Sequence, residues 1–334
     1  MRLSALQEIA QRLRAHPAAV HSRHLLIRGK KRLVHTPRDE GLRQALVALV
    51  GCIELPIATT MRRDEIAHGY IPGRSAYTNA RCHVGATWVQ RLDIKNFFPS
   101  ISAAHVEAAL TEAGMGEDAA RFIVAFTTFG GSLPLGFIPS PLLSNLVATN
   151  IDIGLLRLAR ERGLCVTRYA DDITLSGEEL FDCHDDVATI VGESGFALNL
   201  AKMSAGTPRN GFRVTGYVLS TGDPRLPRHV KRETRQDLYS VERIGITEQA
   251  KHRGRTPQSF GRRLLARLGS IRQSEPLVYE RMRSDFPLAF ERLDALRESA
   301  RVTREQKSAR LERELLSMPT AAPAYYTPLH PAGR

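Results

Sequence analysis

The apolar positions along the chain alternate in some segments and recur at helical spacing in others. Alternation with a period of two predicts four strands in the middle of the chain: Trp88–Ile94, Cys165–Tyr169, Ile173–Ser176 and Val214–Val218. Two shorter runs nearer the start, His24–Arg28 and Arg32–His35, flank a Gly-Lys-Lys sequence. We interpret them as a hairpin with a basic tip.

Helical spacing of apolar residues predicts helices around these strands. The segments are Leu3–Leu13, Gly41–Ile53, Ala103–Glu112, Asp118–Phe129 and Glu178–Glu193. Proline near a first turn predicts further helix starts at Pro139, near Pro227 and at Pro257, where Thr256 would be the cap. More charged helix is expected from Pro276 to Met318, followed by a flexible tail over 318–334 that is rich in Pro and Ala.

The composition fits a globular protein with a polyanionic partner. A chain of 334 residues, 43% of them apolar, is long enough for two or three structural lobes around a substantial core. The formal net charge is +12, although solubility or attraction to a membrane surface would also explain such an excess. Residues 221–270 hold 12 Lys or Arg against 5 Asp or Glu and so supply +7 of this charge.

Cysteine spacing and hydropathy exclude several classes of protein. Cys52, Cys82, Cys165 and Cys183 lie far apart, so neither a zinc site nor a disulfide framework is expected. No apolar run approaches the ~20 residues needed to span a bilayer. The N-terminus lacks the basic-then-apolar layout of a signal peptide, and we therefore expect a cytoplasmic protein without a membrane partner.

Candidate chemistry centres on Asp171 and Asp172, at the bend between two predicted strands. Paired carboxylates at a tight turn repel one another and lose solvation unless a cation joins them. Aspartate is also a common turn residue, so the pair alone leaves both interpretations open. Asp93, at the end of another predicted strand, adds a third carboxylate that can face the same two metals if the strands share a sheet. Two such cations catalyse in-line displacement at phosphorus, which predicts nucleotidyl transfer.

Five segments, in order, resemble motifs of one enzyme family. Leu92–Ile101, Leu133–Asn145 and Tyr169–Asp172 resemble core motifs of reverse transcriptases. Asn79–His83 is similar to the NAxxH signature, and Val214–Gly216 to the VTG signature, of retron reverse transcriptases. The resemblance runs from about residue 25 to about residue 275. It implies an α+β right-hand polymerase fold, with fingers and palm in residues 1–224, a basic helical thumb in 225–317 and the tail beyond.

The resemblance also implies which residues hold the metal ions. Asp93, Asp171 and Asp172 would be catalytic, and together with Ile94 they would bind two Mg²⁺ ions. One departure from the family pattern is Leu135, where the family usually has glutamine. A polar contact to the nucleotide sugar is therefore in doubt, but the metal site is not.

Four further residues would contact the incoming deoxynucleoside triphosphate: Arg32, Phe98, Gly136 and Lys202. The Arg32 guanidinium suits phosphate oxygens, although a solvated surface arginine is the simpler interpretation. The Phe98 ring would exclude a 2′-hydroxyl, or it is plain core. Gly136 would let the backbone approach a substrate closely. Lys202 would neutralise or protonate pyrophosphate as it leaves.

RNA contacts are implied at seven positions: Asn79, His83, Val214, Thr215, Gly216, Arg262 and Arg263. From the residues alone, Asn79 could instead cap a helix that runs into His83. The basic helices after residue 221 would grip phosphates, or they form a solvated face without a partner.

The most specific expectation is a retron reverse transcriptase. The resemblance implies that it copies part of a cognate structured noncoding RNA into DNA, primed from an RNA 2′-hydroxyl, and acts in phage defence with an effector protein. One alternative is another bacterial reverse transcriptase, such as a group II intron enzyme or a different defence polymerase. Only 118 residues follow Gly216, which leaves little room for a maturase region. The second alternative is a noncatalytic RNA-binding scaffold. Leu135 favours it, and the presence of all three acids argues against it.

Overall fold

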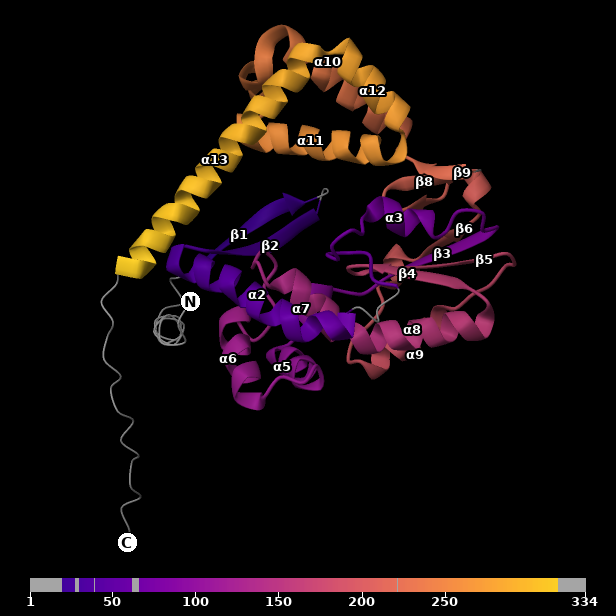
Figure 1. Cartoon of the computed structure of the whole chain (residues 1–334). Helices are drawn as coiled ribbons and strands as arrows, with labels where there is room; N and C mark the ends of the chain where they lie inside the picture. Colours follow the sequence, from indigo (N-terminus) through magenta and orange to yellow (C-terminus); the bar gives the residue numbers. More distant parts are fainter. Residues whose placement is uncertain (1–19, 28–29, 39, 62–65, 221, 318–334) are drawn as a thin grey trace. The chain divides into compact units, whose positions relative to one another are not determined.

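A computed structural model describes residues 20–27, 30–38, 40–61, 66–220 and 222–317 (Figure 1). The chain divides between Pro227 and Arg228 into two compact units. The expected helix Leu3–Leu13 and the expected tail at 318–334 lie outside the described residues.

A four-stranded antiparallel sheet forms the centre of the first unit. Its strands are β3 (Trp88–Asp93), β4 (Cys165–Tyr169), β5 (Asp172–Gly177) and β6 (Ser204–Gly206), in the order β4-β5-β3-β6. The predicted strands at 88–94, 165–169 and 173–176 are therefore confirmed. They share one sheet, in which Asp93 lies opposite Asp172 and Tyr169 lies opposite Asp172.

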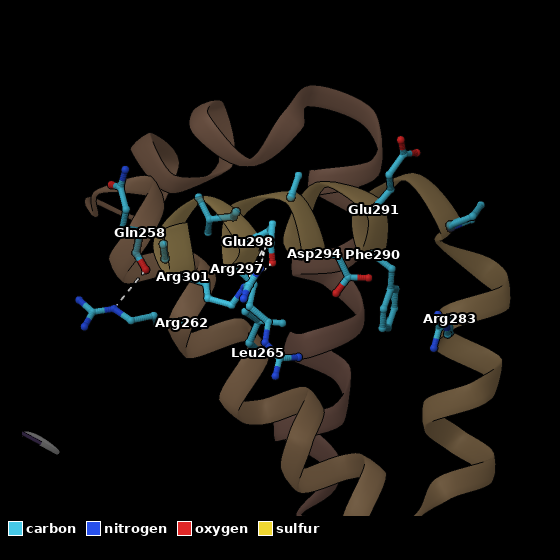
Figure 2. Close-up of a pocket in the computed structure, with 14 residues that line it drawn as sticks. Gln258, Arg262, Leu265, Arg283, Phe290, Glu291, Asp294, Arg297, Glu298 and Arg301 are labelled. Carbon is cyan, nitrogen blue, oxygen red and sulfur yellow. Dashed lines mark hydrogen bonds and ion pairs between the residues drawn. The ribbon is translucent and has the colours of Figure 1, made fainter. Parts of the chain in front are cut away.

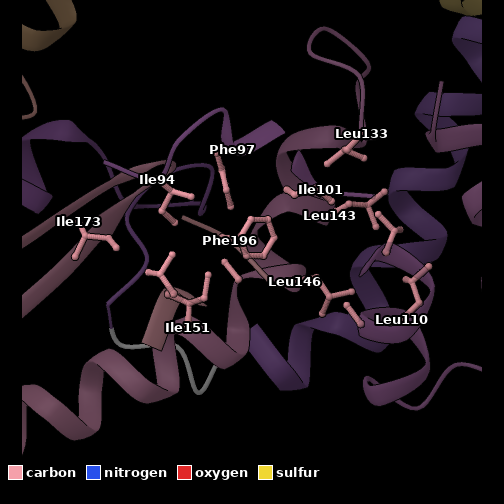
Figure 3. Packing of buried hydrophobic residues seen from close by; sticks show 14 of the residues in the cluster. Ile94, Phe97, Ile101, Leu110, Leu133, Leu143, Leu146, Ile151, Ile173 and Phe196 are labelled. Carbon is pink, nitrogen blue, oxygen red and sulfur yellow. The ribbon is translucent and has the colours of Figure 1, made fainter. Parts of the chain in front are cut away.

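The pleat of this sheet separates an apolar face from a polar one. Leu92, Val166, Ile173 and Leu175 belong to the main hydrophobic core, together with side chains of α8 (Thr149–Arg162) and α9 (His184–Glu193). Figure 3 shows this core around Ile151, Ile173 and Phe196. Neighbouring positions along each strand point to opposite faces, so the acids at the strand ends and Thr167, Thr174 and Ser176 occupy the other face.

Further helices extend the core of the first unit. They are α2 (Glu40–Met61), α4 (Phe97–Ser100), α5 (Ala103–Glu112), α6 (Glu117–Thr127) and α7 (Ser140–Val147). The prediction for 103–112 is confirmed to the residue, whereas α2 continues beyond its predicted end at Ile53. The helix predicted from Glu178 begins only at His184. Its expected first residues form an irregular loop that contacts β3, in which Trp88 Nε1 donates to Phe181 O at 2.9 Å and Gln90 Nε2 to Asp182 Oδ1 at 2.7 Å.

The basic hairpin predicted near the start of the chain is confirmed. It consists of β1 (Val20–Ile27) and β2 (Lys30–Pro37), and Leu25 pairs with Arg32. Lys30 and Lys31 of the predicted Gly-Lys-Lys tip belong to β2, and residues 28 and 29 lie outside the described residues. The hairpin joins the rest of the unit through His35, whose N–H donates to Leu135 O at 2.8 Å.

A short helix and a small sheet complete the first unit. Helix α3 (Ala76–Arg81) starts at Ser75, whose hydroxyl accepts from Thr78 N. Asn79 therefore lies inside the helix, and its interpretation as a cap is wrong. The small sheet contains β7 (Arg213–Val214), β8 (Tyr217–Ser220) and β9 (Gly222–Arg225).

The prediction of one continuous strand over Val214–Val218 is also wrong. Thr215 and Gly216 form the turn between β7 and β8, with φ angles of 47° and 91°. Two successive positive φ angles are what a tight two-residue hairpin requires, because they match the twist of its strands.

The second unit is helical. Its elements are α10 (Arg228–His252), α11 (Pro257–Ser274), α12 (Pro276–Asp285) and α13 (Pro287–Ser317). Thr256 caps α11 as predicted, since its hydroxyl accepts from Ser259 N at 3.2 Å. Helix α10 is kinked at Gly245, where φ is 85°.

One buried carboxylate ties the second unit together around this kink. Asp237 is 1% exposed and accepts hydrogen bonds from Gln249, Arg253 and Arg267. These donors come from the far half of α10, from the loop after it and from α11. Asp237 therefore links the first half of α10 to the part of the chain after the kink and to α11.

Among the described residues, no single helix is long and apolar enough to cross a membrane. The adjacent helices α7 and α8, which are bent by 49° relative to one another, are together long and apolar enough, judged only by their length and composition.

Candidate active site

The three predicted acids meet at one end of the four-stranded sheet. Asp93 ends β3 opposite Asp172, the first residue of β5, and Asp171 occupies the turn before it. The N–H of Ile94 donates to Asp171 O at 2.9 Å and fastens the end of β3 to this turn. Asp93 is 4% exposed, so its carboxylate has largely left water.

Burial and mutual repulsion make this cluster attractive to a cation. Burial raises the pKa of Asp172 to about 6, and the charge of Asp171 acts in the same direction. Burial, followed by the charge of Asp93, raises the pKa of Asp171 as well. Lys202 and Arg32 oppose the shift at Asp171. Both cationic residues that the sequence assigned to nucleotide binding thus act electrostatically on the acids.

Lys202 lies directly on the acid cluster. Its ammonium donates to both carboxylate oxygens of Asp93. The Asn199 N–H holds the same segment in place by donating to the main-chain oxygen of Asp93 at 2.7 Å. Lys202 is therefore the cation that neutralises Asp93 in this structure.

The donor set fits a hard divalent cation, although its side chains are not gathered as ligands. Across the part of the chain that is described, no three His, Cys, Asp or Glu side chains converge on one metal position. The Asp93 carboxylate is instead in contact with the Lys202 ammonium. Three partly buried carboxylates are nevertheless the kind of ligand that such a cation prefers. The Ile94 side chain has no oxygen, so only its main-chain carbonyl could contribute.

Sequence reasoning missed the residues that support the turn at Asp171. The fully buried Arg168 guanidinium donates from Nε and a terminal nitrogen to the two Asp152 oxygens, each at 2.5 Å. Its other terminal nitrogen donates to Asn145 Oδ1 at 3.0 Å and to Ala170 O at 3.1 Å. The available signals were an arginine within a mostly apolar strand and an aspartate between two isoleucines.

Ala170 explains why this support is needed. It precedes Asp171 in the turn with φ at 57°, a conformation that usually requires glycine because a Cβ is crowded there. Gly69 packs against the turn so closely that an added Cβ would lie 2.6 Å from Ala170 N. The turn is thus held from one side by Arg168 and from the other by the Gly69 backbone.

The remaining nucleotide candidates lie at different depths. Arg32 is exposed on β2, and Phe98 is partly buried with its ring 5.8 Å from that of Phe97, which is core as predicted. Gly136 has φ at 113°, and an added Cβ would lie 2.5 Å from His35 O. A close approach at Gly136 is therefore made by β2, and the expected approach of a substrate there stays a prediction.

The two signature segments dock on the polar face of the sheet and on one another. His83 is fully buried, with its ring nitrogens 2.7 Å from Ser176 Oγ and 2.7 Å from Thr167 Oγ1. Thr215 Oγ1 donates to Ala76 O at 2.6 Å, which joins the β7–β8 turn to α3. Asn79 is also buried, and its amide finds no hydrogen-bond partner within the described segments.

This arrangement corrects part of the predicted RNA surface. The side chains of Asn79, His83 and Val214 are buried and cannot meet RNA in this conformation. Gly216 is exposed and Thr215 is half-buried. Arg262 and Arg263 are exposed on α11. Arg262 also lines a pocket whose walls include Arg283 and Phe290 (Figure 2).

The buried His83 gives a testable dependence of stability on pH. Burial, followed by the charge of His68, lowers its pKa from 6.5 to about 3. Below pH 6.5 the unfolded chain therefore binds a proton that the folded chain does not. The free energy of unfolding should fall as the pH decreases, by up to ~1.4 kcal/mol per pH unit.

Chemical denaturation at pH 5 and pH 7.5 measures this effect. The His83→Gln variant cannot titrate at this position and should lose less stability than the wild-type protein over the same interval. His252→Gln, which alters an exposed histidine, serves as the control and should behave like wild type. Equal losses in wild type and His83→Gln would show that another group is responsible.

The sequence matches one protein family and several of its members. Residues 42–219 match the family described as "Reverse transcriptase (RNA-dependent DNA polymerase)". Retron Mx65 reverse transcriptase of Myxococcus xanthus is 33% identical over 248 residues, which cover 65% of this chain and 56% of that protein. Retron Ec86 reverse transcriptase of Escherichia coli is 28% identical over 215 residues, which cover 64% of this chain and 66% of that protein. The chain thus spans less than two thirds of these relatives.

Among solved structures, a telomerase from Candida albicans in complex with a TWJ fragment of telomeric RNA aligns with 84% of this chain and 63% of its own. The TM-score is 0.49 and the sequence identity 10%.

Proposed function

The chain belongs to the reverse transcriptase family, and on that premise we propose that it copies RNA into DNA as a retron reverse transcriptase. The observation that carries the proposal is the meeting of Asp93, Asp171 and Asp172 at one end of the sheet. Reverse transcriptases generally use divalent metal ions, and Mg²⁺ is the ion we assign here. In this proposal residues 1–224 are fingers and palm, 225–317 are the thumb, and 318–334 are a tail.

The roles of the chain's own residues follow from their chemistry. The three aspartates and the Ile94 carbonyl would hold two Mg²⁺ ions, which activate the attacking oxygen and stabilise the leaving one. The Arg32 guanidinium binds the triphosphate through paired hydrogen bonds. Lys202 moves its ammonium from Asp93 to the departing pyrophosphate, where it neutralises charge or donates a proton. The Phe98 ring excludes a 2′-hydroxyl and so selects deoxynucleotides.

The partners follow from the resemblance to retron enzymes. The template is a structured noncoding RNA, the primer is a 2′-hydroxyl of that RNA, and the product is a DNA joined to it. A role in phage defence with an effector protein belongs to the same proposal.

Sequencing of the nucleic acid that copurifies with the protein tests the proposal. A short DNA covalently joined to a structured RNA is expected, and the Asp171→Asn variant should carry the RNA without the DNA. Free DNA with no linked RNA would favour a group II intron-like enzyme or another defence polymerase. RNA without DNA in the wild-type sample would favour a noncatalytic scaffold.

The proposed binding of RNA phosphates by the second unit gives a further prediction. Changing Arg262 and Arg263 together to glutamate should weaken RNA binding about tenfold at physiological salt, for cognate and unrelated RNA alike, because phosphate contacts release condensed counterions. Binding titrations at several salt concentrations should also show a shallower salt dependence. Arg157→Glu, at an exposed position on α8, is the control and should bind like wild type. Unchanged affinity in the double variant would remove α11 from the RNA surface.

A further inference from the structure

Tyr70 is an exposed aromatic residue held in an unfavourable backbone conformation. It is 46% exposed, and its φ is 63°. Residues other than glycine rarely adopt this region, because the Cβ approaches the backbone too closely. Such a conformation persists only where the surrounding structure imposes it, and it is concentrated at functional sites. Burial of the ring cannot explain it here, since nearly half of the residue remains in solvent.

The backbone before Tyr70 is fastened to the strand and turn that carry Asp171. Arg168 donates its N–H to Ile66 O, and His68 donates its N–H to Arg168 O, each at 2.7 Å. Asn145 Nδ2 donates to Gly69 O at 2.8 Å. With Gly69 packed against Ala170 N, the position of Tyr70 is set by the same network that holds the turn.

The Tyr70 ring meets Phe98. Their ring centroids are 6.3 Å apart, and the ring planes cross at 77°. Phe98 also contacts Phe97, with the ring centroids 5.8 Å apart and the ring planes crossing at 70°. Edge-to-face contacts of this kind are favourable and directional. Phe98 thus contacts one buried ring and one exposed ring, and only the exposed ring depends on the strained segment at residue 70.

We propose that Tyr70 is a positioning residue for sugar selection, which acts by holding the Phe98 ring where it blocks a 2′-hydroxyl. The inference rests on the proposed polymerase function and on the assignment of Phe98 within it. Without the Tyr70 ring, Phe98 has room to rotate away, and a ribonucleotide then fits. The backbone strain at residue 70 places an aromatic ring in solvent beside Phe98, which an unstrained turn would not do.

The test measures kcat/KM for a deoxynucleotide and for the matching ribonucleotide in primer extension on an RNA template. Phe98→Ala should raise ribonucleotide use. Tyr70→Gly should reduce the preference for deoxynucleotides by about tenfold, chiefly through a lower KM for the ribonucleotide. Tyr70→Phe keeps the ring and should keep the preference. The double variant should be no less selective than Phe98→Ala, because Tyr70 acts through Phe98.

Glycine is chosen at position 70 because it separates selectivity from folding. Glycine adopts positive φ without strain, so Tyr70→Gly should unfold at the wild-type temperature or above it. Loss of selectivity without loss of stability is a result that a merely structural role for Tyr70 does not produce. Tyr239→Ala removes another exposed tyrosine, from the second unit, and should leave selectivity unchanged.

The outcomes distinguish this inference from the function on which it rests. If Phe98→Ala loses selectivity while Tyr70→Gly retains it, the role of Tyr70 is wrong and the polymerase function stands. Additive effects in the double variant, or an unchanged ratio in Phe98→Ala, would also overturn the inference. If the wild-type protein extends no primer, the proposed function fails and the inference fails with it.

Discussion

Replacing Asp171 with asparagine is expected to abolish DNA synthesis, with a loss in kcat of about a thousandfold or more. The change removes one of three carboxylates on which the proposed Mg²⁺ site depends. It also removes a charge that raises the pKa of Asp172, so the repulsion within the folded site decreases. The variant should therefore fold. It should also bind RNA as wild type does, because the proposed phosphate contacts are made by Arg262 and Arg263 on α11, which the change leaves intact.

Primer extension over a range of Mg²⁺ concentrations measures this prediction. Asp185→Asn is the matched control, because Asp185 is exposed in the first turn of α9 and should tolerate the change. Extension by Asp171→Asn at near the wild-type rate would falsify the metal assignment. An RNA affinity that falls along with the activity would instead indicate general damage to the fold.

Replacing Asp152 with alanine should cost the first unit ~3–5 kcal/mol of unfolding free energy. Arg168 is fully buried, and Asp152 supplies two of the hydrogen bonds of its guanidinium. Without Asp152 a buried charge remains without compensation. Urea denaturation measures the loss. The control is Asp186→Ala, whose ion pair with Arg162 at 3.0 Å is partly exposed and should contribute less than ~1 kcal/mol.

A compensating variant separates stability from positioning. Arg168→Met combined with Asp152→Leu replaces the ion pair by apolar contacts and should recover most of the lost stability. It should not recover activity, because Ala170 O and Asn145 lose the donor that holds the turn before Asp171. Full activity in this stable variant would show that Arg168 contributes only to folding.

The strands and the acids at their ends could be predicted because the signals are local. Alternation around Asp93 and around the Asp171–Asp172 pair marks both strands, and the carboxylates follow directly. Thr256 before Pro257 marked the start of α11 for the same reason. These features depend on residues within one turn or one strand, and a single sequence displays them.

The errors and the missed contacts arose where residues distant in the sequence decide the local structure. The segment at 178–183 favours a helix by its own sequence, but it forms an irregular loop that is hydrogen-bonded to Trp88 and Gln90. Gly136 accommodates β2, which lies a hundred positions earlier in the chain. The burial of Arg168 depends on Asp152 and Asn145, each more than a dozen residues away. No local pattern shows which of many polar residues will meet.

The buried carboxylate of Asp237 limits how the second unit can change over evolution. One side chain accepts hydrogen bonds from Gln249, Arg253 and Arg267 at once. A substitution at any of these four positions changes how much the other three contribute to the free energy of unfolding, so the positions are epistatic. Loss of Asp237 alone leaves two guanidinium groups without their shared acceptor, whereas loss of one arginine leaves the acid partly satisfied. Removal of all three donors would leave a buried carboxylate without compensation, so a viable mutational path through this cluster replaces the acid before the last donor is lost.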